Sequence, residues 1–123
     1  MTRIILDSSA WIEYFADRPK ADRIRPFLTD PRRILVPAVV FYEVQKKALT
    51  AFNEEVAETV AGRLSQSESV ALDRDQALTA AHLGLKHRLA MADALILAAA
   101  RSCDAELITL DTDFRGIPGV RVL

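Results

Sequence analysis

The sequence predicts an α/β fold in which helices cover a parallel sheet of four or five strands. Short apolar runs rich in β-branched residues alternate along the chain with longer segments of helical periodicity, and this alternation is typical of a parallel sheet. Hydrophobic residues make up 50% of the 123-residue chain, which is enough for one packed core without disulfides or a structural metal. We therefore expect residues 1–123 to form a single domain.

The first half of the chain alternates strand and helix signals, and each signal has a local physical cause. β-Branched apolar runs indicate buried strands, small hydroxyl residues indicate helix starts, and prolines indicate helix boundaries. In chain order, the expected elements are a strand at 3–6, a helix at 10–15 capped by Ser8 or Ser9, a short helix at 20–30, a strand at 34–36, and a helix that starts at Pro37, runs to about Thr50 and continues over 52–64.

The second half repeats the same pattern. We expect a strand at 70–72, a helix capped by Asp73 and running to about His87, an unusually apolar helix at 91–102, a strand at 106–110 and an edge strand at 121–123. In sheets of this kind, the functional site lies beyond the carboxyl ends of the strands. The polar residues at the carboxyl ends of the predicted strands are therefore the first candidates for a functional site.

Composition and charge leave the partner open. With 16 basic and 17 acidic residues, the net charge of −1 does not point to nucleic acid, although a local basic patch is compatible with it. Cys103 is the only cysteine, so no internal disulfide forms, as is usual in the cytosol. The longest apolar stretch, at 95–100, is too short to cross a bilayer, and residues 4–6 are too few for a signal-peptide core. We expect a soluble cytoplasmic protein.

Four acidic residues stand in apolar surroundings. Asp7 directly follows the first predicted strand and Asp111 follows the fourth, whereas Glu43 and Asp93 lie within apolar helical segments. A buried carboxylate is costly unless it is paired or bound to a metal. Crowded carboxylates repel one another, and Mg²⁺ or Mn²⁺, which prefer oxygen ligands, relieve that repulsion. The sequence therefore predicts a divalent metal site centred on Asp7 and Asp93.

Each of these acids also has a simpler structural interpretation. The simpler roles are a helix cap for Asp7, an ion pair with Lys46 or Lys47 for Glu43, a buried cap or a hydrogen-bonded aspartate for Asp93, and an Asx-turn for Asp111. Each role is reasonable singly, but four such residues at the predicted site edge are harder to explain in this way. Other chemistries find less support, because the histidines and Cys103 lack zinc-site spacing and no glycine-rich phosphate loop is present.

The chain carries four motif-like segments in a fixed order, at residues 5–9, 37–43, 92–96 and 107–114. Together they resemble the motifs of PIN-domain proteins, and most closely those of VapC-type toxins from type II bacterial toxin–antitoxin systems. The resemblance spans essentially the whole chain. It implies a three-layer α/β/α sandwich around a four- or five-stranded parallel sheet. It also implies an endoribonuclease that depends on Mg²⁺ or Mn²⁺.

The resemblance further implies roles and partners. The catalytic acids would be Asp7, Glu43, Asp93 and Asp111, with Asp7 and Asp93 as the metal ligands and with Ser9 and Asp113 in supporting roles. The substrate would be RNA, and a VapB-like antitoxin would neutralise the protein. Members of this family commonly form homodimers.

Two rival functions make different predictions. A non-catalytic module of the same fold would bind RNA or a partner without cleaving it, and would be expected to have lost at least one of the acids. In a phosphoryl-transfer or receiver-type domain, an aspartate at a strand end would be phosphorylated; such domains usually carry adjacent acids early in the chain and a late lysine. Here Asp7 has no acidic neighbour, and no lysine follows Lys86.

Overall fold

A computed structural model describes residues 2–123 and shows a five-stranded sheet in which every pair of neighbouring strands is parallel. The strands lie in the order β3-β2-β1-β4-β5. Their bounds are β1 (Ile4–Leu6), β2 (Ile34–Pro37), β3 (Glu68–Val70), β4 (Glu106–Thr109) and β5 (Val120–Val122). The chain fills one half of the sheet with β1 to β3 and then returns to the other side of β1 with β4. The sheet therefore reverses its strand order between β1 and β4.

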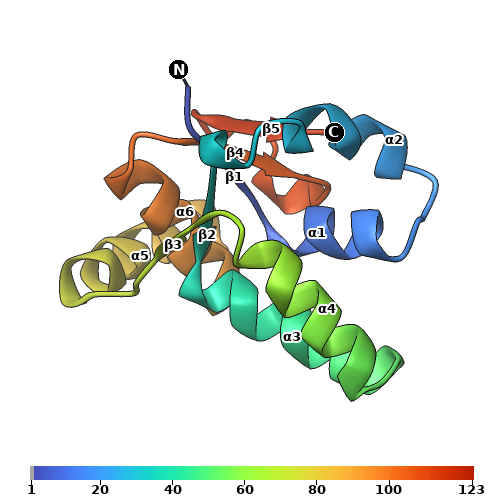
Figure 1. The fold of residues 1–123 in the computed structure, drawn as a ribbon. Helices are drawn as coiled ribbons and strands as arrows, with labels where there is room; N and C mark the ends of the chain where they lie inside the picture. Colours follow the sequence, from blue (N-terminus) through green and yellow to red (C-terminus); the bar gives the residue numbers. More distant parts are fainter. Residues whose placement is uncertain (1) are drawn as a thin grey trace.

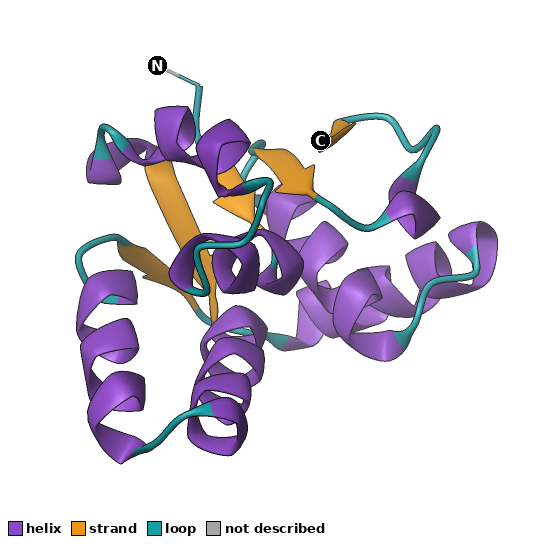
Figure 2. Cartoon of the chain, turned by 90° about the vertical axis from the view of Figure 1, so that its right-hand side faces the viewer, coloured by secondary structure: helices purple, strands orange, loops and turns teal. Residues whose placement is uncertain are grey.

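Helices cover the sheet on both faces, as Figures 1 and 2 show. The α-helices are α1 (Ser8–Phe15), α2 (Ala21–Ile24), α3 (Ala38–Ala51), α4 (Glu54–Leu64), α5 (Arg74–His87) and α6 (Met91–Ser102). Short 3₁₀ segments occur at Arg25–Leu28, Pro31–Arg33 and Thr112–Phe114. The predicted α/β class and the three-layer arrangement are confirmed. Within residues 2–123, no helix has both the length and the apolar character needed to cross a bilayer.

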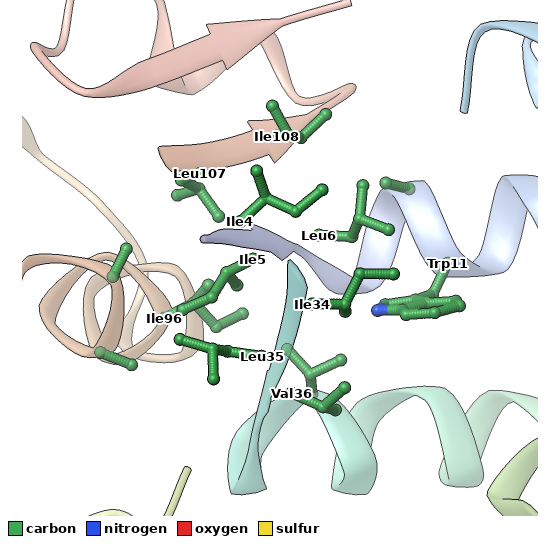
Figure 3. Packing of buried hydrophobic residues seen from close by; sticks show 14 of the residues in the cluster. Ile4, Ile5, Leu6, Trp11, Ile34, Leu35, Val36, Ile96, Leu107 and Ile108 are labelled. Atoms are coloured by element: carbon green, nitrogen blue, oxygen red, sulfur yellow. The ribbon is translucent and has the colours of Figure 1, made fainter. Parts of the chain in front are cut away.

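The core forms because alternate residues of a strand point to opposite faces of the sheet. Figure 3 shows Ile5 and Leu35 on the side of Ile96 from α6, while Leu6 and Ile34 lie toward Trp11 of α1. All of these side chains are buried. The central strands are apolar on both faces, which is the pattern expected of a parallel sheet between two helical layers.

Small residues let α5 and α6 approach closely. Ala80 of α5 and Ala94 and Ala98 of α6 form a separate buried cluster. At Gly84 of α5, an added Cβ would meet the Cβ of Ala94 at 3.4 Å. This contact explains the unusually apolar sequence of α6, which is covered by the sheet on one side and by α5 on another. It also fixes the first turn of α6, which carries Asp93.

Three sequence predictions about the elements are wrong in detail. The helix predicted across 37–64 is broken at Phe52, and a new helix, α4, begins after Asn53, whose side chain accepts a hydrogen bond from the Val56 amide at 2.8 Å. The third strand occupies 68–70 rather than 70–72, because pairing with β2 sets its position and leaves Leu72 exposed. The cap of α1 is Asp7, not Ser8 or Ser9.

The remaining boundaries are close to those predicted. The segment predicted as a helix at 20–30 is divided between α2 and a 3₁₀ segment. β4 ends at Thr109, one residue earlier than expected, and β5 lies at the sheet edge at 120–122. The helix after Asp73 and the apolar helix at 91–102 have the predicted bounds.

The broken helix gives a prediction of definite sign. Replacing Asn53 by Ala removes the cap of α4, so we expect the Asn53→Ala variant to lose about 1 kcal/mol of unfolding free energy in urea denaturation. In an unbroken helix the same change would raise stability, because alanine has the higher helix propensity. Asn53→Asp, which keeps the capping oxygen, is the matched control and should stay close to the wild type. A gain in stability for Asn53→Ala would contradict the observed break.

Candidate functional site

The sequence-predicted acids Asp7 and Asp111 come together where the strand order reverses. β1 and β4 are neighbours, with Leu6 opposite Ile108, and the Asp7 amide donates to the Ile108 carbonyl oxygen at 3.0 Å. In open parallel sheets, the crevice at such a reversal is the usual ligand site. The observed order also differs from the 2-1-3-4-5 order of receiver domains, which removes the receiver alternative.

Asp7 is a buried carboxylate held by three hydrogen bonds. Its side chain is only 2% exposed. Oδ1 accepts from the Ser9 hydroxyl at 2.6 Å and from the Ala10 amide at 3.0 Å, and Oδ2 accepts from the Thr109 hydroxyl. A carboxylate offers about two lone-pair directions on each oxygen. The contacts among residues 2–123 therefore leave one direction open, on Oδ2.

Opposing effects set the charge of Asp7. Burial raises the pKa of the Asp7 carboxyl above its usual value, the hydrogen bonds from Ser9, Thr109 and Ala10 lower it in part, and the nearby Asp111 carboxylate raises it further. The start of α1 adds a favourable interaction, because the positive end of the helix dipole faces its capping residue. Being a helix cap is thus confirmed for Asp7, but a cap alone does not require such complete burial.

Glu43 does not form the lysine pair that its helix position suggested. Its Oε1 accepts the Ser8 hydroxyl at 2.5 Å, which links α3 to the first turn of α1. The ion pairs within residues 2–123 do not include Glu43. Ser8 and Ser9, predicted as caps, instead each donate to a different carboxylate of the proposed site.

Asp93 lies in the first turn of α6 and is half-buried. Ala90 holds the cap position of α6 without a side-chain hydrogen bond, so the alternative role of Asp93 as a helix cap is excluded. Burial, followed by repulsion from the carboxylates of Asp111, Asp7, Glu43 and Asp113, raises the pKa of Asp93 to about 6. The four predicted catalytic acids and Asp113 therefore share one electrostatic environment.

Asp111 and Asp113 occupy the segment after β4. The Asp113 amide donates to Asp111 Oδ1 at 2.9 Å, so Asp111 caps the 3₁₀ segment Thr112–Phe114 as the Asx-turn interpretation predicted. Its other oxygen accepts no hydrogen bond from residues 2–123, and its charge acts on both Asp7 and Asp93. Asp113 is exposed and contributes the smallest of the four repulsions on Asp93.

The arrangement suits a hydrated divalent ion better than a cage of direct ligands. In the part of the chain that the structure describes, no three Asp, Glu, His or Cys side chains are close enough to hold one metal together. Mg²⁺ usually keeps several waters and binds through one or two carboxylates. Asp7, with its single open lone pair, and Asp93, which lacks a side-chain hydrogen bond among the described residues, have the chemistry for that binding mode.

Sequence reasoning missed Thr109 and the role of Ser8. Thr109, at the end of β4, is fully buried and donates to Asp7. One signal was present: Thr109 is the only hydroxyl residue in the apolar run 107–110, directly before an acid. Nothing in the local pattern could reveal its partner, because Asp7 lies 102 residues earlier in the chain.

The parallel sheet, the two helical layers and the acidic edge define a three-layer α/β protein of the PIN type. Residues 4–120 match the PIN domain, and the chain belongs to the PIN-domain family. The predicted family is therefore confirmed. A search of curated proteins gave no match.

Solved structures of toxins share this fold over nearly their whole length. A chain in a toxin–antitoxin complex from Klebsiella pneumoniae has a TM-score of 0.83 at 27% identity, with 97% of this chain and 96% of that chain covered. For a chain in the DNA-bound VapBC of Salmonella typhimurium, the TM-score is 0.80 at 22% identity, with 100% of this chain and 98% of that chain covered. For VapC20 of Mycobacterium tuberculosis, a toxin that cleaves the sarcin–ricin loop, the TM-score is 0.75 at 19% identity. The match covers 94% of this chain and 95% of that chain. The predicted resemblance to VapC-type toxins thus extends to three dimensions.

The raised pKa of Asp93 predicts how metal-free stability depends on pH. The carboxyl titrates near 3.8 when unperturbed and near 6 in the fold, so its neutral form favours folding at low pH. That contribution is lost as pH rises through about 6. In EDTA, Asp93→Asn should therefore unfold at higher urea than the wild type at pH 7, with a smaller difference at pH 4.

The control for this comparison is Glu58→Gln, which neutralises an exposed carboxylate on α4. It should follow the wild type at both pH values. Equal pH dependence of Asp93→Asn and the wild type would show that Asp93 does not carry the strained charge.

Proposed function

We propose that this protein is the toxin of a toxin–antitoxin system and acts as an endoribonuclease that depends on Mg²⁺ or Mn²⁺. The observation that carries the proposal is the buried Asp7 carboxylate, which is electrostatically coupled to Asp93 and Asp111 at the carboxyl edge of the sheet, where Glu43 also acts on Asp93. Membership of the PIN-domain family and the likeness to VapBC structures support it. A module that only binds RNA would not need this accumulation of unpaired negative charge.

Each acid has a distinct task in this proposal. Asp7 and Asp93 hold the ion, and bound Mg²⁺ would supply charge stabilisation at the scissile phosphate and lower the pKa of a water molecule. Glu43 uses Oε1 for the Ser8 hydroxyl, so Oε2 is left to orient water. Asp111 uses Oδ1 for the Asp113 amide and presents Oδ2 in the same way. Ser9 keeps the Asp7 carboxylate in place.

The test is RNA cleavage by Asp7→Asn. Asparagine is as good a helix cap as aspartate, so the fold and α1 should survive. With Mg²⁺ present, loss of the anionic ligand should lower the cleavage rate on total RNA to the level of the wild type in excess EDTA. This loss should exceed the effect of about 10–100-fold that is typical when a residue supporting a metal ligand is removed. Glu58→Gln, the exposed carboxylate control, should cleave normally.

The same variants separate catalysis from mere binding. Full cleavage by Asp7→Asn, or cleavage by the wild type in EDTA, would contradict the proposed mechanism. Absence of Mg²⁺ binding in calorimetry at millimolar metal, with RNA still bound, would favour the non-catalytic module instead.

We also propose a VapB-like antitoxin and a second copy of the chain as partners. An apolar groove of about 620 Å³ lies between α1 and the α3–α4 pair, with Phe15, Val44, Phe52 and Val56 among its lining residues. Phe52 is 60% exposed in the isolated chain, as suits a residue that a partner covers. Further large apolar side chains are exposed on α3, α5 and α6, including Tyr42, Leu85 and Met91, and they support association of two copies.

Expression in bacteria tests both partners. The chain alone should arrest growth, and co-expression with the product of an adjoining small open reading frame should restore growth and yield a stable complex. Light scattering of the purified chain should give the mass of a dimer. The inactive Asp7→Asn variant is the control, which should bind the antitoxin without arresting growth. Arrest that no adjoining gene relieves would contradict the antitoxin, and a monomeric mass would contradict the dimer.

A further inference from the structure

Thr109 carries a buried hydroxyl group at the end of an otherwise apolar strand. It is the last residue of β4, is 0% exposed, and follows the buried pair Leu107 and Ile108. Its Oγ1 donates to Asp7 Oδ2 and accepts from the Asp111 amide at 2.9 Å. A hydroxyl has a single proton. The Asp111 amide and an ionised Asp7 carboxylate leave the hydroxyl one role toward each: it accepts from the amide and donates its proton to the carboxylate.

Ser9 likewise accepts from a backbone amide and donates to Asp7, but to the other oxygen of the carboxylate. Its hydroxyl donates to Asp7 Oδ1 at 2.6 Å and accepts from the Leu110 amide at 3.2 Å. The two hydroxyl oxygens lie 3.4 Å apart. The two amides that follow β4 are thus connected to the Asp7 carboxylate. The Leu110 amide is linked through the Ser9 hydroxyl to Oδ1, and the Asp111 amide through the Thr109 hydroxyl to Oδ2. This bridge ties Asp7 to the segment that carries Asp111.

We propose that Thr109 is a positioning residue for the cation site. Its hydroxyl fixes the rotation of the Asp7 carboxylate so that one lone pair of Oδ2 stays open, and it fixes Asp7 relative to Asp111. The inference rests on the proposed function, since it takes Asp7 to be a metal ligand. It goes further by assigning a specific task to a residue outside the acidic set.

The bonds to Oδ1 cannot perform this task alone. Ser9 and the Ala10 amide both reach Oδ1, so they act on one end of the carboxylate and leave Oδ2 to find its own partner. Valine has nearly the same shape as threonine and suits a buried strand equally well. With valine at 109, Oδ2 would lose its donor and the Asp111 amide would lose its acceptor, so both groups could change direction.

The experiment measures Mn²⁺ affinity by calorimetry and RNA cleavage as a function of Mn²⁺ concentration. Removing a side chain that orients a metal ligand typically weakens metal binding by about 10–100-fold, and we expect a loss of this size for Thr109→Val. Thr109→Ser keeps the hydroxyl and should bind Mn²⁺ like the wild type. Thr79→Val makes the same chemical change on the exposed face of α5 and is the matched control.

A positioning role predicts that the substitution affects the Mn²⁺ requirement of cleavage more than the rate at saturating Mn²⁺. The Mn²⁺ concentration for half-maximal cleavage should rise for Thr109→Val, and saturating Mn²⁺ should recover much of the rate. Circular dichroism should show that the variant remains folded. Thr109→Ala serves as a second variant, with the same expected loss of affinity.

Other outcomes overturn the inference. Wild-type Mn²⁺ affinity in Thr109→Val, or failure of Thr109→Ser to retain affinity, would show that the hydroxyl does not position Asp7. Unfolding of both the Val and Ala variants would assign Thr109 to folding instead. If the wild type itself neither binds Mn²⁺ nor cleaves RNA, the proposed function fails and this inference fails with it, whereas an active wild type with an unaffected Thr109→Val contradicts the inference alone.

Discussion

The rest of this site depends on one buried interaction, the capture of the Asp7 carboxylate between β1, α1 and β4. The carboxylate caps α1, receives a hydroxyl from that helix and receives another from the end of β4. These contacts join the consecutive elements β1 and α1 to β4, whose Thr109 lies 102 residues further along the chain. They occur where the strand order reverses, so the fold builds its most constrained polar group at the position where parallel sheets bind ligands.

That constraint determines the electrostatics of the neighbouring acids. Asp7 is held in place near Asp93 of α6 and near Asp111 of the segment after β4. Burial of Asp93, and after it repulsion from the neighbouring carboxylates, raises the pKa of Asp93 to about 6. Groups whose environments disfavour their charged forms are typical of functional sites, where stability is exchanged for reactivity or binding. The close packing of α5 on α6 helps to fix the first turn of α6, which carries Asp93. In the proposed function, a hydrated divalent cation would relieve this repulsion.

Local patterns predicted most of the fold because most elements have local causes. β1, α5 and α6 follow from a β-branched run, a cap at Asp73 and an apolar helical segment. The break at Phe52 was missed because fourfold apolar spacing continues across it, and only the packing of α4 back onto α3 shows the turn. Asp7 and Asp111 were placed correctly from their positions at strand ends. The partners of Glu43 and Thr109 depend on contacts 35 and 102 residues apart, which no local pattern encodes.

The most direct test of the central claim is the position of a bound Mn²⁺ ion in crystals of the protein, located by its anomalous scattering. The account predicts one strong peak beside Asp7 Oδ2, within coordination distance of that oxygen and of Asp93, with water completing the coordination. Absence of a peak at saturating Mn²⁺, or a peak elsewhere with the Asp7 carboxylate unchanged in its three hydrogen bonds, would contradict it.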